Sequence, residues 1–202
     1  GPWGNTFVSK IVSNGTRLVV LDGSKTLWTY GRNASGKIAD AVTGVLDVDG
    51  SFVYSLIDGS AFLLSASGNT VMVAGGRGDI KFKSLYAAIV NGDDITLATD
   101  AGLLFRGGDT KKLSLLAGGG ARAKVNSFIT INNRLFGFAS DSLVEIGSTV
   151  EYIVKTSNEI NVLKGPQGKV LLSGLEVGSI SEISREGKVT PWIYGSVKTK
   201  LS

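Results

Sequence analysis

Two residue types that carry much of enzyme chemistry are missing from this chain. Its 202 residues include no cysteine and no histidine. Thiol nucleophiles, disulfides, Ser-His-Asp relays and zinc or iron sites built on imidazole or thiolate are therefore excluded. The catalytic groups that remain are paired carboxylates, lysine, tyrosine and serine.

Three carboxylates lie in apolar segments that are typical of strands: Asp47, Asp49 and Glu159. Glycoside hydrolysis needs two carboxyl groups on opposite sides of the substrate, about 5 to 9 Å apart. Asp47 and Asp49 belong to one segment and are separated by a single residue, so they do not meet this requirement. The sequence thus predicts a protein that is not an enzyme and has no catalytic residue.

The same Asp-Val-Asp-Gly run, residues 47–50, resembles the start of a calcium loop. Such a loop brings several oxygen ligands into one short turn, and no third acidic residue follows within the next five positions. We therefore expect a hairpin turn here, no metal site and no cofactor.

The segment 31–38, GRNASGKI, matches the phosphate loop GxxxxGK as far as Lys37. Ile38 then stands where a Ser or Thr would bind magnesium, and no helical pattern follows. A phosphate loop directs backbone N–H groups and a helix N-terminus at the anion. This segment is therefore predicted to be a Gly-rich turn before a strand.

The glycine-rich run AGGRGD, residues 74–79, contains the tripeptide Arg77-Gly78-Asp79. This tripeptide serves in cell adhesion when it is displayed outside a cell, but it is also common by chance. The run is predicted to be an exposed connection between two repeats, which makes its charged residues candidates for binding.

A repeat of about forty residues organises the whole chain. Five segments share the order apolar run, Gly or Asn turn, apolar run, acidic turn, apolar run. The first turn falls at Gly15, Gly50, Gly92, Asn133 and Gly168, and an acidic residue follows seven or eight positions later, at Asp22, Asp58, Asp100, Asp141 and Glu176. A period of this size predicts a repeat architecture.

Each repeat is predicted to contain four short antiparallel strands. Gly and Asn tolerate the positive φ of a tight hairpin, and the flanking Val, Ile, Leu and Phe favour strands. The acidic residue is expected to accept hydrogen bonds from backbone N–H groups just ahead of it and so to close the turn into the third strand. No window combines helical spacing with caps, so almost no helix is expected.

This pattern of four strands per repeat resembles a β-propeller blade, most closely the blades of NHL-type and quinoprotein-like propellers. The WD dipeptide, the kelch glycine pair and the Asp-box are missing, so no named family follows. The resemblance implies an all-β, five-bladed β-propeller. The alternatives are a segment of a larger propeller, a β-solenoid or two packed sheets.

The expected domain limits follow from the repeats. Residues 1–4 are expected to be a tag remnant and lead-in, residues 5–197 a single propeller domain, and residues 198–202 a tail. The expected blades span 5–42, 43–82, 83–123, 124–156 and 157–197.

The charge pattern narrows the choice of partner. The formal net charge of +4 arises from 21 Lys and Arg against 17 Asp and Glu, and the two signs are interspersed. Nucleic-acid binding is therefore not expected. No apolar run approaches the roughly 18 residues of a membrane helix, so no membrane insertion is expected either.

The expected function is that of a non-catalytic interaction or structural module that binds a protein partner through loops on one face of a propeller. In such a fold, the connections between blades emerge on the same face as the turns between second and third strands. The residues that these connections place there are Arg77, Asp79, Arg122, Lys124 and Asn158. The alternatives are a glycan-binding propeller of the lectin type, a glycoside hydrolase and a structural component of a phage or other viral particle.

Overall fold

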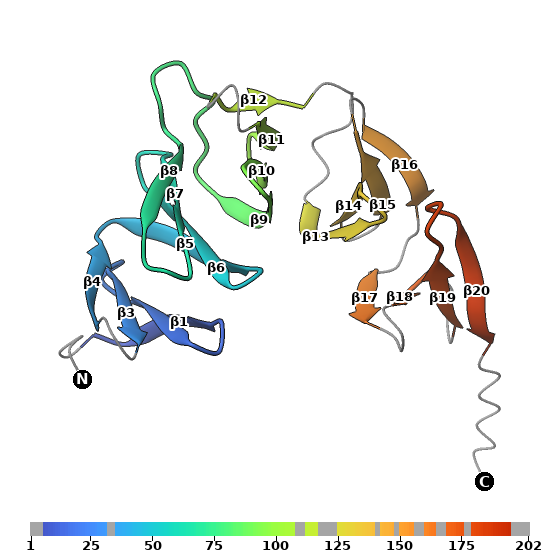
Figure 1. Cartoon of the computed structure of the whole chain (residues 1–202), viewed down its shortest axis with the longest axis horizontal. Coiled ribbons are helices and arrows are strands. Elements are labelled where there is room, and N and C mark those ends of the chain that lie inside the picture. Colours follow the sequence, from blue (N-terminus) through green and yellow to red (C-terminus); the bar gives the residue numbers. More distant parts are fainter. Residues whose placement is uncertain are drawn as a thin grey trace, which may run out of the picture. The chain divides into compact units, whose positions relative to one another are not determined.

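A computed structural model of the chain describes residues 6–31, 35–107, 112–116, 125–139, 142–147, 150–155, 160–164, 169–175 and 179–194. These residues form five four-stranded antiparallel sheets and no helix (Figure 1). Each sheet consists of four strands that are consecutive in the sequence and adjacent in the sheet. The predicted all-β class and the four strands per repeat are therefore confirmed.

The chain divides into two compact units, Gly1–Leu116 and Ala117–Ser202. The first unit holds three sheets: β1 (Val8–Ser13), β2 (Arg17–Asp22), β3 (Leu27–Gly31) and β4 (Ser35–Ala39); β5 (Val42–Val48), β6 (Ser51–Leu56), β7 (Ala61–Leu64) and β8 (Thr70–Ala74); and β9 (Leu85–Asn91), β10 (Asp94–Thr99), β11 (Gly102–Arg106) and β12 (Ser114–Leu115).

The second unit holds two sheets: β13 (Val125–Ile131), β14 (Arg134–Ala139), β15 (Ser142–Ile146) and β16 (Val150–Lys155); and β17 (Asn161–Lys164), β18 (Val170–Ser173), β19 (Ser179–Ile183) and β20 (Val189–Tyr194). No helix within the described ranges is long and apolar enough to cross a membrane.

The hairpin turns form where the sequence predicts them. Gly15, Gly50, Gly92 and Asn133 have φ angles of 85°, 82°, 60° and 61°. Asp49, with φ of 46°, precedes Gly50 in a two-residue turn between the paired residues Val48 and Ser51. Two successive positive φ angles define the type I′ turn that matches the twist of a hairpin. The turn predicted at residues 47–50 is therefore confirmed, whereas Gly168 lies outside the described residues.

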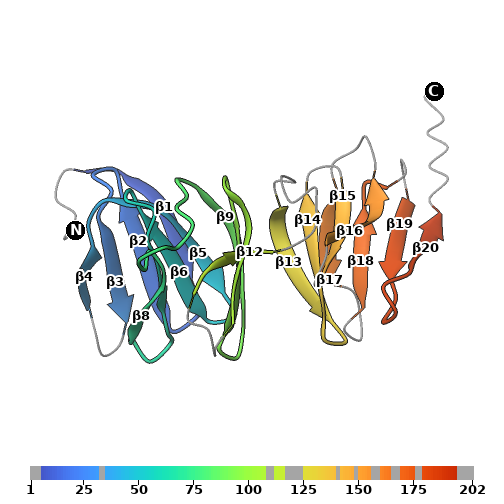
Figure 2. The same ribbon diagram turned by 90° about the horizontal axis from the view of Figure 1, so that it is seen from above.

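The core of the first unit lies between its sheets, which follow one another in Figure 2. β6 is buried on both faces: Phe52 packs with Val19 and Leu27 of the first sheet, while Val53 packs with Leu97 of the third. Successive strand residues point to opposite faces, so a nearly continuous apolar run such as β6 is what a middle sheet requires.

The second unit has a core of its own. Phe136, Phe138 and Leu143 of one sheet pack against Leu172 and Ile183 of the other. Each sheet therefore supplies one apolar face to a neighbour, as the alternation of apolar residues along its strands requires.

Candidate functional site

The predicted binding residues fall into two groups. Arg77 and Asp79 lie in the connection 75–84, between β8 and β9, which we call the 75–84 loop. Arg122, Lys124 and Asn158 lie outside the described residues. Of the predicted binding residues, the structure therefore describes Arg77 and Asp79, which lie in the same loop, and the site is built from that loop.

The Asp79 carboxylate shapes the first half of the 75–84 loop. Its Oδ2 accepts hydrogen bonds from the backbone N–H groups of Gly75 and Gly76, at 3.1 and 2.8 Å. Its Oδ1 accepts one from the N–H of Leu113, just before β12, at 3.1 Å. These three bonds direct the carboxylate into the protein, so the arginine of the Arg-Gly-Asp tripeptide is displayed without its aspartate. That Asp79 itself binds a partner stays a prediction.

The Asp100 carboxylate fixes the second half of the 75–84 loop. Its Oδ1 accepts hydrogen bonds from the N–H groups of Lys83 and Ser84, both at 2.8 Å, while the Asp100 N–H donates to the Ser84 carbonyl at 3.1 Å. Burial raises the pKa of Asp100, but the hydrogen bonds from Ser84 and Lys83 outweigh it and leave the pKa below its usual value. The side chain expected to close its own turn thus holds the preceding connection instead.

The equivalent aspartates of the first two repeats behave as predicted. Asp22 Oδ1 accepts hydrogen bonds from the N–H groups of Ser24 and Thr26, both at 2.9 Å, and Asp58 Oδ1 accepts one from the N–H of Ser60 at 2.9 Å. Local turn closure by a carboxylate is therefore confirmed at these two positions. Asp141 and Glu176, predicted to play the same part, lie outside the described residues.

An aromatic anchor holds the 75–84 loop against the second sheet. Phe82 is buried, and Gly59 passes so close that a Cβ there would lie 2.8 Å from the Phe82 carbonyl oxygen. Gly59 also has a φ of +84°, which favours glycine. The loop is therefore fixed at three points: the carboxylates of Asp79 and Asp100 and the ring of Phe82.

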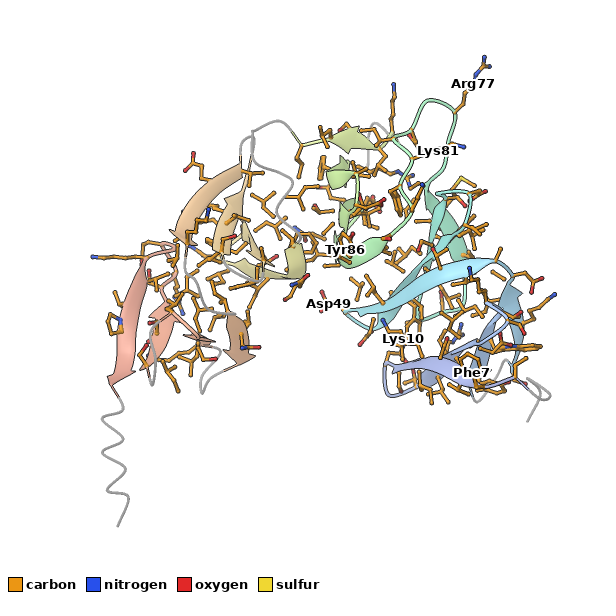
Figure 3. All side chains as sticks on the ribbon, turned by 180° about the vertical axis from the view of Figure 1, so that it is seen from behind. Phe7, Lys10, Asp49, Arg77, Lys81 and Tyr86 are labelled. Atoms are coloured by element: carbon orange, nitrogen blue, oxygen red, sulfur yellow. The ribbon has the colours of Figure 1, made fainter. Side chains whose placement is uncertain are left out.

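The cations of the loop face the solvent. Arg77, Lys81 and Lys83 are exposed, and Figure 3 shows Arg77 at the tip of the loop, pointing away from the ribbon. Lys81 and Lys83 were not among the predicted site residues. The alternation Ile80-Lys81-Phe82-Lys83 is the signal that identifies them, because it places the apolar side chains inward and the lysines outward.

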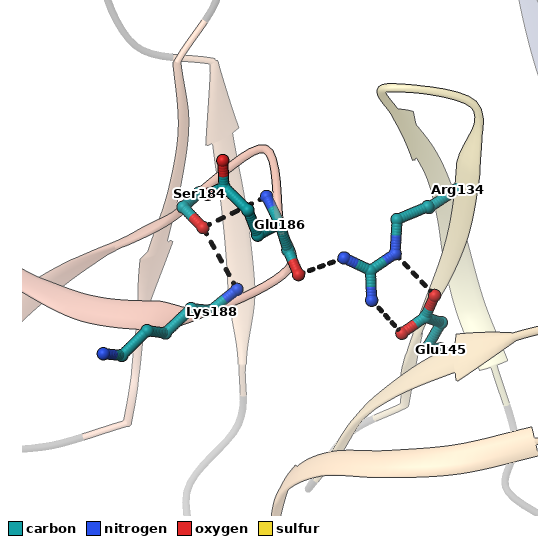
Figure 4. A network of polar contacts seen from close by, with 5 residues as sticks. All are labelled: Arg134, Glu145, Ser184, Glu186 and Lys188. Atoms are coloured by element: carbon teal, nitrogen blue, oxygen red, sulfur yellow. Dashed lines mark hydrogen bonds and ion pairs between the residues drawn. The ribbon is translucent and has the colours of Figure 1, made fainter.

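The Arg134 side chain of the second unit is used in the opposite way (Figure 4). Its Nε and Nη2 donate to the two carboxylate oxygens of Glu145, at 2.7 and 2.5 Å, and its Nη1 donates to the backbone carbonyl of Glu186. The guanidinium also lies over the Phe136 ring, with the Arg134 Cζ atom 5.5 Å from the ring centroid. The Arg134 guanidinium thus stabilises the second unit through contacts within that unit.

The carboxylates considered for catalysis do not form a pair in the described residues. Asp47 and Asp49 are exposed at the β5–β6 hairpin, and Glu159 lies outside the described residues. No group of three or more Asp or Glu side chains in the described ranges is arranged to hold a metal ion. Lys37 of the phosphate-loop-like segment lies in β4 and pairs with Asp40 at 2.8 Å.

Neither a family model nor a curated protein sequence matches the chain. Solved structures do. The extracellular domain of a putative one-component system from B. thetaiotaomicron matches with a TM-score of 0.61 and 13% identity over 94% of this chain and 28% of that one. This chain thus spans little more than a quarter of that domain.

Two further matches cover more of the other protein. A virginiamycin B lyase from Staphylococcus aureus matches with a TM-score of 0.63 and 10% identity, over 93% of this chain and 70% of the lyase. A chain of the mitotic checkpoint complex matches with a TM-score of 0.64 and 10% identity, over 94% and 65%. Identities this low show the fold alone. Together with the five four-stranded sheets, they show that this chain has a β-propeller fold with five blades.

Proposed function

We propose that this chain is a non-catalytic β-propeller module that binds a protein partner through the 75–84 loop. The observation that carries the proposal is the bracing of the loop: the carboxylates of Asp79 and Asp100 and the buried ring of Phe82 fix it, while Arg77 remains exposed. A loop that is already ordered loses little conformational entropy on binding.

The amino-acid composition of this chain argues against its sharing the catalytic chemistry of one structural neighbour. The virginiamycin B lyase is described as catalytically inactive when one of its histidines is replaced by alanine. The present chain contains no histidine. We therefore propose that the two proteins share the fold and that this chain carries a different functional site on it.

Affinity capture with three forms of the chain tests this proposal. The forms are the wild type, Arg77→Glu with Lys81→Glu, and a control with Lys10→Glu and Lys155→Glu. Lys10 and Lys155 are exposed on β1 and β16, so the control changes the charge equally at other places. Circular dichroism checks that all three are folded, and mass spectrometry identifies retained proteins from cells of the source organism.

A protein retained by the wild type and the control but lost by the loop variant supports the proposal. Retention by all three forms contradicts the placement of the interface on the 75–84 loop. If the wild type retains no protein, the proposal of a protein-binding module is wrong.

A further inference from the structure

We infer that the 75–84 loop recognises an extended acidic segment of its partner, with acidic side chains at alternate positions. Arg77 would take one carboxylate as the anchor, and Lys81 and Lys83 would take the flanking ones. The inference rests on the proposed function and names the chemistry of the partner.

Arg77 is the anchor because its guanidinium is unused. It forms no ion pair with any residue that the structure describes, whereas Arg106 donates to the Met72 carbonyl at 2.7 Å and Arg134 is paired with Glu145. Guanidinium binds carboxylate through two parallel N–H···O bonds, which give strength and orientation. An exposed arginine on a braced loop is therefore suited to a carboxylate.

The glycines beside Arg77 leave room for a partner. Gly78 has a φ of +87°, and apart from its chain neighbours Arg77 and Asp79 no described residue has an atom within 4 Å of the place where a Cβ would be. Gly76 instead faces the Asp79 carboxylate, whose Oδ2 would lie 3.1 Å from a Cβ. The inner side of the turn is thus filled by Asp79, and the open side is the one at Gly78.

Two lysines extend the basic surface with a regular spacing. Along residues 80–83 the side chains alternate between half-buried Ile80, exposed Lys81, buried Phe82 and exposed Lys83. Lys81 and Lys83 are thus both exposed on the solvent side of the loop. An extended acidic segment presents its alternate carboxylates on one side, about 6.6 Å apart, and so offers one carboxylate to each of the two exposed lysines.

Two carboxylates restrict which acidic chains fit. Asp58 interacts electrostatically with Lys81, and Asp100 with Lys83. These carboxylates repel additional negative charge beside the lysines, because like charges close together are unfavourable. We therefore expect spaced carboxylates to bind better than a continuous polyanion such as RNA.

Fluorescence anisotropy with a defined probe tests the inference. The probe is a labelled peptide of alternating glutamate and serine, and its matched control has glutamine in place of glutamate. We expect the wild-type chain to bind the glutamate peptide and not the glutamine peptide. Arg77→Ala should weaken binding at least about tenfold, as loss of a central arginine anchor does. Arg77→Lys should bind with intermediate affinity, because it keeps the charge and loses the two-bond geometry.

Controls separate this recognition from general attraction to negative charge. Lys10→Ala removes an exposed cation from β1 and should leave binding of the glutamate peptide within about twofold. Single-stranded RNA that binds as tightly as the peptide, or an Arg77→Ala variant that binds the peptide normally, would overturn the inference.

The outcome is distinguishable from failure of the proposed function. If a protein is captured through the loop but the glutamate peptide does not bind, the acidic segment is wrong while the protein-binding role stands. If the peptide binds but no protein is captured, the proposed function is wrong and the loop is only a binding site for carboxylates.

Discussion

Two regions of the first unit are organised by an aspartate, with different results. In the turn after β2, the Asp22 carboxylate is buried and accepts hydrogen bonds from two backbone N–H groups and from Trp28 Nε1, the last at 2.9 Å. In the 75–84 loop, the partners of the Asp79 carboxylate among the described residues are all backbone N–H groups, and the connection is exposed. The first arrangement ties a turn to the core, and the second fixes the shape of a loop that displays Arg77.

The largest expected effect is therefore at Asp22. Asp22→Ala leaves two backbone donors and the Trp28 indole N–H without their acceptor. We expect the free energy of unfolding to fall by about 2 to 4 kcal/mol, because donors left unsatisfied near the core are costly. Chemical denaturation followed by circular dichroism measures it. Asp93→Ala, at an exposed turn position, is the control, and an equal loss in both variants would show that Asp22 has no special part.

Low pH should destabilise the protein by protonating the carboxylates that close the turns, Asp22 and Asp58. Burial raises the pKa of Asp22, but its hydrogen bonds from Trp28, Thr26 and Ser24 outweigh this and lower the pKa below its usual 3.8. Hydrogen bonds from Ser60 lower the pKa of Asp58 as well. A pKa lower in the folded than in the unfolded state means that the stabilisation is complete above the unfolded value and is lost as the pH falls.

We therefore expect the free energy of unfolding of the wild type to decrease progressively as the pH drops below about 5. The free energy of unfolding of the Asp22→Asn variant should decrease less steeply with falling pH. Denaturation curves at a series of pH values measure both slopes. Parallel slopes for Asp22→Asn and the wild type would mean that Asp22 does not contribute to the acid sensitivity.

A smaller effect is expected at Asp79. Asp79→Ala removes three hydrogen bonds from an exposed loop, where water replaces them, so the free energy of unfolding should fall by about 1 kcal/mol or less. Amide hydrogen exchange at Gly75, Gly76 and Leu113 should nevertheless become faster. Asp79→Asn keeps one acceptor oxygen and should show a smaller increase. Unchanged exchange in Asp79→Ala would show that Phe82 and Asp100 suffice to hold the loop.

The repeats made most of the fold predictable. The turn residues Gly50 and Asn133 require positive φ, and the regular offset to Asp22 and Asp58 marks the second turn. These are local interactions, and local interactions can be read from the order of residues. The number of strands and the position of each hairpin follow from them.

The candidate site was only partly predictable, because its contacts are not local. The sequence places Arg77 and Asp79 in an exposed connection, but the bond from Leu113 to Asp79 joins residues 34 positions apart. The bonds from Lys83 and Ser84 to Asp100 span 17 and 16 positions. The local sequence differs, since Asp22 stands in Asp-Gly-Ser and Asp100 in Asp-Ala-Gly, but it does not reveal that the partners of Asp100 belong to the connection before β9.

The smallest expected change in stability completes the comparison. Arg77→Ala removes a side chain that pairs with no described residue, so the free energy of unfolding should stay within about 0.5 kcal/mol of the wild type. Arg134→Ala, a matched arginine truncation, removes the Glu145 pair, the bond to the Glu186 carbonyl and the contact with Phe136, and should be clearly less stable. Denaturation curves of the two variants measure the difference. If Arg77→Ala is destabilised as much as Arg134→Ala, the Arg77 guanidinium is part of the loop's own structure and is not free to bind a partner. If only Arg134→Ala is destabilised, any loss of binding in Arg77→Ala belongs to the interface, because the loop that carries it is still folded.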